Sequence, residues 1–359
     1  MRKRMIKRPE RIKTGDTIGI TAPSFGAFIE PYSLLIDIAE DNLRDRGYRI
    51  LEGKTARLGD GIGISTDPKV CGAELMDFYK RDDIDAIISA GGGELMNETI
   101  TYVDFDELKN YKPKWYVGYS DNTNFIFPLV TITGVQGIYG PCINGYAKVW
   151  EDTENDTFAI LEGTKSSFKG YDMFVEPSKE EKTEIEEYTT EYLKAPYALN
   201  AKRQLVSYVH DGKKLIPANG AEIKMKGVLL GGCLDVLSNL VGTRFDRMKE
   251  FVKNNPEIIW VLEACDLNPM FIRRSIWNLR EAGWFDTASG FVIGRPRASW
   301  KEAIMGADQY NAVTDVVANL GVPVVMDAEI GHIDPMLPVI MGAQAEVNAK
   351  GNDFSFSYS

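Results

Sequence analysis

Short apolar runs alternate with amphipathic stretches along the N-terminal part of the chain. The runs DTIGITAP (16–23), IDAIISAGGG (84–93), KWYVGYS (114–120) and GVQGIYGP (134–141) end at glycine, proline or serine, as buried strands do. YRILEG has the same form. Before it, residues 34–47 place apolar side chains at three- and four-residue spacing and stop at a glycine, which predicts a helix. Strands that alternate with helices indicate a parallel α/β sheet.

The pattern then changes twice, which indicates two domains. Residues 146–220 are acidic and have few long apolar runs, so we expect a linker or substrate loop rather than core. A second folded unit, 221–359, begins with AEIKMKGVLLGG and ends in AQAEVNAKGNDFSFSY, which alternates like a hairpin around Lys350-Gly351. We predict an N-terminal α/β domain over 1–145 with a flavodoxin-like parallel sheet, and a smaller C-terminal α/β domain.

The composition narrows the class of protein. Of 359 residues, 44% are hydrophobic and 26% charged, and no apolar run approaches the roughly 18 residues of a membrane-spanning helix. The net charge is −11, although the first thirteen residues carry seven basic groups and one acid. A body this acidic argues against nucleic acid as a partner. The basic terminus lacks the apolar segment of a signal peptide, so we expect a cytoplasmic protein without a membrane partner.

Four cysteines are widely spaced along the chain and show no C-x-x-C pairing: Cys71, Cys142, Cys233 and Cys265. This spacing argues against a zinc ribbon and against a disulfide framework. We therefore expect reduced and mostly buried thiols.

Three polar residues that could form a catalytic site each follow a predicted strand. Ser120 lies in GYSDN, which resembles half of the G-x-S-x-G nucleophile elbow, with Asn122 in place of the closing glycine. Glu263 closes the apolar run IIWVLE, where an unpaired buried carboxylate would be unfavourable. His332 follows the apolar run 322–326. A serine nucleophile needs a base, and the base needs an orienting acid.

Each of these residues also has a structural interpretation. Ser120 could be the N-cap of the following helix. Glu263 could form a salt bridge at the edge of the sheet, and Asp266 could substitute for it as the orienting acid. His332 could be a satisfied surface or core histidine. The other histidine, His210, lies in a polar stretch typical of an exposed turn.

The run Gly91-Gly92-Gly93 ends another predicted strand and offers bare backbone N–H groups. An oxyanion hole needs such donors, and the N–H of Asp121, next after the serine, would be a second one. The glycine run lacks the G-x-G-x-x-G spacing of dinucleotide-binding enzymes. Ligands of open parallel sheets bind outside the carboxyl ends of the strands. The residues alone therefore indicate a serine hydrolase whose site takes groups from both domains.

Taken together, these stretches resemble the LD-carboxypeptidase family of serine peptidases, which includes the microcin C immunity peptidases. The resemblance runs from GDTIGITAPS (15–24) through GGG and VGYSDNT to GVLLGGCLDVLSNLVGT (227–243), VLEACD and GHIDP. It implies a two-domain α/β enzyme, often dimeric, with no metal or cofactor. It also implies a catalytic triad at the domain junction, formed by Ser120, Glu263 and His332.

The resemblance further implies a mechanism and two classes of substrate. Ser120 would give its proton to His332 and attack the scissile carbonyl to form an acyl-enzyme, while Glu263 orients the base. The oxyanion would be bound by the N–H groups of Gly92, Gly93 and Asp121. The bond cleaved would be an amide next to a free carboxylate. The substrate would be either a muropeptide, as in peptidoglycan recycling, or an aminoacyl or peptidyl nucleotide, as in microcin immunity.

Two departures bear on the choice of substrate. Cell-wall enzymes of the family usually carry an arginine where this chain has Gly91, and ELMNE follows the glycines here. With the long 146–220 segment, this is closer to the microcin-immunity branch. That branch stacks a nucleotide base on a tryptophan of this loop, yet the only tryptophan between 116 and 259 is Trp150. Other aromatic residues could stack instead: Tyr192, Tyr197 or Tyr208.

A substrate carboxylate would need a cationic partner, and four arginines of the second domain are the nearest candidates in sequence: Arg273, Arg274, Arg295 and Arg297. The alternative function, from another class, is a non-catalytic two-domain small-molecule-binding protein with the same architecture and crevice. A serine-directed covalent probe separates the two hypotheses, because only a hydrolase should be labelled at Ser120.

Overall fold

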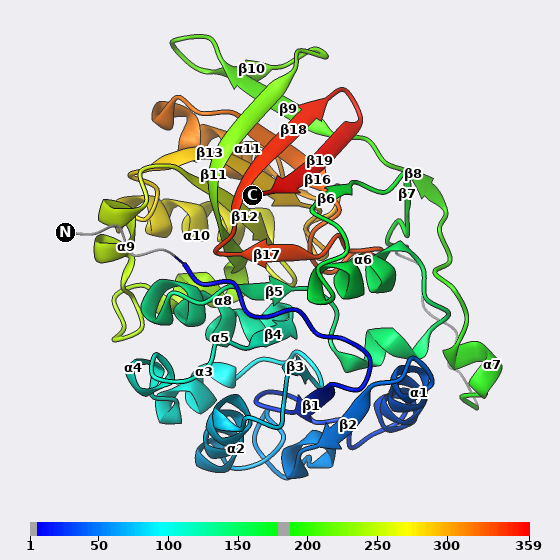
Figure 1. Ribbon diagram of the computed structural model, residues 1–359. Helices are drawn as coiled ribbons and strands as arrows, with labels where there is room; N and C mark the ends of the chain where they lie inside the picture. Colours follow the sequence, from blue (N-terminus) through cyan, green and yellow to red (C-terminus); the bar gives the residue numbers. More distant parts are fainter. Residues whose placement is uncertain (1–5, 179–186) are drawn as a thin grey trace.

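The computed structural model describes residues 6–178 and 187–359, which fold around two β-sheets (Figure 1). The blue and cyan N-terminal elements occupy one end of the molecule and the yellow to red C-terminal elements the other. Part of the basic terminus (1–5) and part of the predicted linker (179–186) lie outside the described residues. Across the described ranges, no helix is long and apolar enough to cross a membrane.

The N-terminal sheet confirms the five strands expected from the first apolar runs. They are parallel and lie in the order 2-1-3-4-5, the doubly wound order of flavodoxin-like folds. Their bounds are β1 Thr17–Thr21, β2 Arg49–Glu52, β3 Ala86–Ser89, β4 Trp115–Gly118 and β5 Gly137–Tyr139. A further strand, β17 (Val339–Met341), pairs antiparallel with β5. The C-terminal part of the chain therefore adds a strand to the N-terminal sheet.

Helices connect these strands, and the first confirms the helix expected over 34–47. α1 (Tyr32–Asp45) buries Ile36, Ala39 and Leu43, whose spacing places them on one face. The other helices and turns of this part are α2 Pro68–Lys80, α3 Met96–Thr99, α4 Phe105–Leu108, α5 Thr123–Pro128, the π-helical turn Leu129–Thr133, and the 3₁₀ turns Lys54–Arg57, Ile100–Tyr102, Ser120–Asn122 and Ile143–Ala147. The loops after β3 and β4 carry the glycine run and the serine, so both lie at the carboxyl edge of the sheet.

The C-terminal sheet has nine strands among the residues described, in the order β10-β9-β16-β13-β12-β11-β18-β19-β6. The central strands β11, β12, β13 and β16 are parallel, and antiparallel strands flank them on both sides. The strand bounds are β6 Ser167–Lys169, β9 Val206–His210, β10 Leu215–Pro217, β11 Ile223–Cys233, β12 Ile258–Glu263, β13 Ala288–Gly294, β16 Val324–Ala328, β18 Gln344–Lys350 and β19 Asp353–Tyr358. The expected hairpin around Lys350-Gly351 is confirmed as β18 and β19.

Helices connect the parallel strands of this sheet as well. They are α8 Leu234–Leu240, α9 Met248–Asn254, α10 Pro269–Glu281 and α11 Asn311–Val317, with a 3₁₀ turn at Ala318–Leu320 and a small two-stranded sheet of β14 Ala303–Ile304 and β15 Ala307–Asp308. The N-cap of α10 is Asn268, whose side chain accepts from the N–H of Phe271, and Pro269 occupies the first helical position. The helix that follows the Glu263 strand therefore has a sequence-encoded start.

The segment expected as an acidic linker, 146–220, is largely part of the folded body. Its helix α6 (Asp152–Leu161) begins with a capping box between Glu151 and Glu154, so these acids serve the helix start. Its strands β6, β9 and β10 join the C-terminal sheet. The remaining elements are β7 Met173–Phe174, β8 Ala201–Lys202 and α7 Thr190–Leu193. The C-terminal domain, expected to be the smaller one, consequently carries the larger sheet.

Helix α5 lies where the two domains meet. The ring of Phe127 on α5 stacks on Trp284 from the C-terminal domain, with centroids 4.9 Å apart and an interplanar angle of 11°. Trp284 in turn stacks on Trp260 of β12 at 6.1 Å. The hydroxyl of Thr123, at the start of α5, accepts the N–H of Cys233 at 3.0 Å. The helix that follows the serine turn is therefore fixed against the second domain.

We expect Phe127→Ala to lower the free energy of unfolding by about 3–5 kcal/mol, because it removes a fully buried ring and leaves a cavity at the domain contact. Urea denaturation of the purified variant measures this change. The control is Phe271→Ala, which truncates a ring that is 47% exposed on α10 and should change stability by no more than about 0.5 kcal/mol. Similar losses in both variants would contradict the packing described.

Candidate active site

Ser120 lies on a strained turn between β4 and α5. Its φ is +61°, in the left-handed region, which costs a non-glycine residue about 1–2 kcal/mol. The N-cap positions of the two following helical turns belong to Tyr119 and Asn122, so Ser120 does not act as the N-cap. Its side chain is only partly buried and lines a pocket. The turn therefore presents the hydroxyl rather than using it to start a helix.

Asn122 holds this turn in place. Its side-chain amide donates to the carbonyl oxygens of Gly91 (2.9 Å) and Tyr119 (3.0 Å), and its carbonyl oxygen accepts from the hydroxyl of Tyr116. The residue that departs from the G-x-S-x-G pattern thus ties the serine turn to the glycine run. The motif alone did not predict this tertiary contact.

Glu263 and His332 form a buried pair at the ends of two strands of the other sheet. Glu263 closes β12, and His332 follows β16 in the loop toward β17. The imidazole Nδ1 lies 2.8 Å from Glu263 Oε2, and both side chains are largely buried. The ring of His332 also packs against Tyr119, next to the serine, with centroids 4.9 Å apart. The structure therefore brings the three predicted triad residues into one region.

Tyr139 connects the serine turn to this pair and was not found by sequence reasoning. Its hydroxyl donates to Glu263 Oε1 at 2.5 Å and accepts the backbone N–H of Ser120 at 3.0 Å. Tyr139 is fully buried at the end of β5. A tyrosine at the end of an apolar strand is common in any sheet, so its sequence position carried no signal.

The two members of the pair stabilise each other's charged form. Burial disfavours both charged forms. For His332, attraction to the carboxylate of Glu263 is the stronger effect and raises the pKa of the imidazole well above its usual range. The charge and hydrogen bond of His332, with the hydroxyl of Tyr139, likewise outweigh burial and lower the pKa of Glu263. The two shifts therefore favour the carboxylate form of Glu263 and the imidazolium form of His332. Because Nδ1 faces Glu263, Nε2 is the ring nitrogen that could exchange a proton with a substrate or a nucleophile.

The glycine run approaches the serine closely, as expected for an oxyanion site. A Cβ at Gly92 would lie 3.1 Å from Ser120 Cβ and 3.3 Å from its Oγ. Gly93 has a φ of +146°, and a Cβ there would lie 2.2 Å from the hydroxyl oxygen of Ser24. The Asp121 carboxylate accepts from Ser24 Oγ and from the N–H of Met96 at 2.8 Å. These contacts place the run and the residue after Ser120 side by side.

A small pocket of about 90 Å³ lies beside Ser120, between the domains. It is lined from the first domain by Gly93, Asp121 and Asn124, and from the second by residues that include Cys233 and Cys265. All four cysteines of the chain are unpaired, and three of them are buried, as expected. The pocket therefore exposes the serine to a ligand held by both domains.

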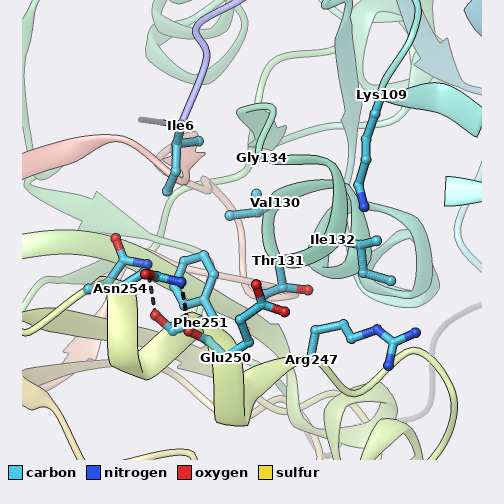
Figure 2. Close-up of a pocket in the computed structure, with 11 residues that line it drawn as sticks. Ile6, Lys109, Val130, Thr131, Ile132, Gly134, Arg247, Glu250, Phe251 and Asn254 are labelled. Atoms are coloured by element: carbon cyan, nitrogen blue, oxygen red, sulfur yellow. Dashed lines mark hydrogen bonds between the residues drawn. The ribbon is translucent and has the colours of Figure 1, made fainter. Parts of the chain in front are cut away.

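A second pocket, drawn in Figure 2, lies between α9, the π-helical turn and the N-terminal segment. Its lining includes Ile6, Val130 and Phe251, together with the basic residues Lys109 and Arg247. None of the three predicted triad residues lines it. We therefore place the candidate site at the pocket beside Ser120.

Of the four arginines expected to meet a substrate carboxylate, only Arg297 contacts a residue that lines this pocket, through Nη1 at 3.6 Å from the sulfur of Cys265. Arg295 is 1% exposed and pairs with Glu329 at 3.3 Å inside the domain. The other two lie on α10, where Arg273 pairs with Asp315 and Arg274 covers the ring of Phe271. Of the four arginines proposed from the sequence, Arg297 is therefore the one placed to meet a substrate carboxylate.

The aromatic residues of the middle segment are mostly engaged elsewhere. Trp150 packs on Phe158 at 4.6 Å and lies under the guanidinium of Arg46 at 3.4 Å. The hydroxyl of Tyr197 donates to Glu154 at 2.7 Å. Neither Tyr192 nor Tyr208, nor these two residues, lines the pocket beside the serine. The structure therefore selects no aromatic platform for a nucleotide base.

Two family models match the chain in the regions that carry this site. The LD-carboxypeptidase N-terminal domain model matches residues 18–140, and the LD-carboxypeptidase C-terminal domain model matches residues 226–347. The first region contains Ser120 and the glycine run, and the second contains Glu263 and His332. Together the two models cover more than half of the sequence. The chain belongs to the LD-carboxypeptidase family.

Curated relatives and solved structures extend the likeness over nearly the whole chain. It is 25% identical to a probable murein peptide carboxypeptidase of Bacillus subtilis, over 95% of this chain and 91% of that protein. It is 23% identical to the microcin C7 self-immunity protein MccF of Escherichia coli, over 96% and 94% respectively. A structure of MccF in complex with glutamyl sulfamoyl guanosine matches with a TM-score of 0.76 at 20% identity, covering 98% of both chains. An MccF-like protein from Bacillus anthracis matches with a TM-score of 0.75 at 20% identity, covering 98% of this chain and 99% of that one.

We expect the imidazole of His332 to titrate well above pH 6.5 in the wild type and below it in Glu263→Gln. The substitution removes the carboxylate that favours the imidazolium, while burial continues to oppose it. NMR titration of the imidazole carbon-bound protons measures both midpoints. The chain has only one other histidine, so a His210→Asn variant assigns the two signals. An unchanged midpoint in Glu263→Gln would show that the pair does not set this pKa.

Proposed function

We propose that this protein is a serine carboxypeptidase in which Ser120 is the nucleophile, His332 the base and Glu263 the acid that orients the base. The observation that carries the proposal is the hydrogen-bonded connection of the strained serine turn, through Tyr139, to the buried Glu263–His332 pair. A mere helix start would need neither the left-handed φ nor this connection. Membership in a family of carboxypeptidases supports the same chemistry.

The reaction follows from the assigned positions. Neutral His332 takes the proton of the Ser120 hydroxyl as its oxygen bonds to the scissile carbonyl carbon, and Glu263 stabilises the imidazolium that forms. The developing oxyanion accepts from backbone N–H groups of Asp121 and of Gly92 and Gly93. The imidazolium then protonates the leaving amine, which departs and leaves an acyl-enzyme. Water, deprotonated by the same histidine, hydrolyses the ester and restores the serine.

The proposed substrate is a small molecule with an amide bond next to a free carboxylate. Arg297 is the cation we assign to that carboxylate, because it lies at the edge of the pocket. The names of the relatives support both a muropeptide and an aminoacyl nucleotide as substrate. A homodimer in the cytoplasm remains our prediction. The alternative, a non-catalytic binding protein, would have no use for the strained serine turn.

We expect Ser120→Ala to lower turnover by several orders of magnitude while leaving the fold intact, because the hydroxyl contributes little packing. Mass spectrometry of the products measures turnover with an L,D-linked muropeptide tetrapeptide and an aminoacyl sulfamoyl adenylate offered side by side. Release of D-alanine would assign the muropeptide, and cleavage of the adenylate would assign the nucleotide class. The matched control is Ser167→Ala, an exposed serine on β6 that should be fully active.

Two further variants test the roles within the triad. Losing the base in His332→Ala should cost more activity than losing the orienting acid in Glu263→Gln. Near-normal turnover in His332→Ala would remove the histidine from the mechanism. Circular dichroism of each variant checks that the fold is retained.

We expect kcat/KM to rise with pH through the raised pKa of His332, because only the neutral imidazole can accept the proton of the serine. The acid limb of the profile should therefore lie well above pH 6.5 in the wild type. In Glu263→Gln the limb should move to lower pH and the plateau should fall. A wild-type limb near the ordinary histidine value would contradict the raised pKa of His332, and the absence of any acid limb would contradict its assignment as the base.

A further inference from the structure

Carboxylates from three separate elements face the pocket beside Ser120. Glu94 comes from the loop after β3, Asp235 from the first turn of α8, and Asp266 from the loop after β12. Within residues 6–178 and 187–359, no lysine or arginine forms a salt bridge with any of the three. A ligand in this pocket would therefore meet acceptors that carry negative charge.

Asp235 is fixed in this position by the second domain. Its carboxylate accepts the backbone N–H groups of Cys265 and Asp266, each at 3.0 Å, and the thiol of Cys233 at 3.2 Å. These three hydrogen bonds hold the carboxylate in one orientation. The side chains of Glu94 and Asp266, by contrast, are exposed at the pocket. The fixed carboxylate of Asp235 and the exposed carboxylates of Glu94 and Asp266 come together only in the folded protein.

Asn124 gives an independent indication of what the pocket binds. This residue lines the pocket and is 2% exposed. Its Nδ2 donates to the carboxylate of Asp121 at 2.7 Å and to its carbonyl oxygen at 3.0 Å, which fixes the orientation of the amide. Its Oδ1 is buried and has no hydrogen-bond partner. A buried acceptor without a donor is unfavourable, so a donor brought to this oxygen would be stabilising.

The charges around the pocket agree with this interpretation. Partial burial, and then the neighbouring carboxylates of Asp266, Asp121 and Asp235, raise the pKa of Glu94. Two cationic groups lie nearby: His332 acts on Glu94 in the opposite direction, and Arg297 lies near Asp266. Four carboxyl groups and two cationic groups therefore surround the pocket.

We propose that this pocket is a subsite for a primary ammonium group of the substrate, so that the enzyme selects amides with a free amine close to the scissile bond. The proposal rests on the proposed function for the identity of the reacting residue. An ammonium group supplies three donors and one positive charge, which suit a lining that includes the oxygen of Asn124 and the carboxylates of Glu94 and Asp266. A pocket of about 90 Å³ suits this compact group.

The arrangement of the side chains also favours an ammonium group over a metal ion. Among the described residues, no group of three or more histidine, cysteine, aspartate or glutamate side chains is arranged to hold a metal ion. An anionic substituent would be repelled by Glu94, Asp235 and Asp266, and we have assigned the substrate carboxylate to Arg297, which contacts Cys265 in the pocket lining. The free amine could be the α-amine of the residue at the scissile bond or an amine on its side chain.

The first test uses binding and does not depend on catalysis. Butylammonium is titrated into the Ser120→Ala protein, with butanol as the neutral ligand of equal length, and the side-chain amide signal of Asn124 is followed by NMR. We expect that signal to shift with butylammonium alone, and the affinity to fall roughly tenfold or more in Asp266→Asn and in Glu94→Gln. The control Glu346→Gln removes an exposed acid on β18 and should bind as before. No shift, or equal shifts with the alcohol, would overturn the proposal.

The second test separates this proposal from the proposed function. The wild type is treated with serine-directed fluorophosphonates that end in an ammonium or a hydroxyl group, on short and long tethers. We expect labelling at Ser120, faster with the ammonium by a factor on the order of ten to a hundred. The preferred tether distinguishes an α-amine from a side-chain amine. Equal rates would overturn the ammonium subsite and leave the hydrolase standing. Absence of labelling with every probe would overturn the nucleophile, while the binding test still decides the subsite.

Discussion

The buried pair of Glu263 and His332 is the interaction on which the rest of the site depends. Each side chain alone would be unfavourable in its environment, since burial opposes both charges. Together they lie 2.8 Å apart, and Tyr139 satisfies the second carboxylate oxygen. These three residues come from β12, the loop after β16, and β5, so the pair connects both sheets. Removing one partner would leave an uncompensated group at the centre of the molecule.

The domain arrangement follows from the same convergence of strand ends. Parallel strands of both sheets direct their carboxyl ends toward the junction, where the serine turn, the glycine run and the acid–histidine pair meet. Helix α5 holds the junction through the stack of Phe127 on Trp284. Strand β17 returns from the C-terminal part of the chain to pair with β5, the strand that carries Tyr139. The site is therefore built from segments that the fold itself keeps together.

The proposed chemistry and the proposed ammonium subsite share the pocket beside Ser120. His332 offers Nε2 for proton transfer, Arg297 is assigned to a carboxylate, and the pocket lining offers acceptors from both domains. In the proposed subsite, carboxylates lie next to an uncharged nucleophile. Such a site would discriminate between substrates by their charge as well as by their shape. This gives a physical basis for specificity within a family whose relatives carry names from two substrate classes.

The sequence by itself determined the strands of the first sheet and the three residues of the proposed triad. Apolar runs that stop at a polar residue mark strand ends, and Ser120, Glu263 and His332 each stand at such a stop. Tyr139 was missed because a tyrosine suits any strand, and Asn124 and Asp235 because polar residues are ordinary near helix starts. Segment 146–220 was predicted to be a linker or substrate loop because it is acidic and has few long apolar runs. Its short strands β6, β9 and β10 pair with strands that are distant in sequence. Only the tertiary structure decided these cases, since contacts between remote strand ends leave no local pattern.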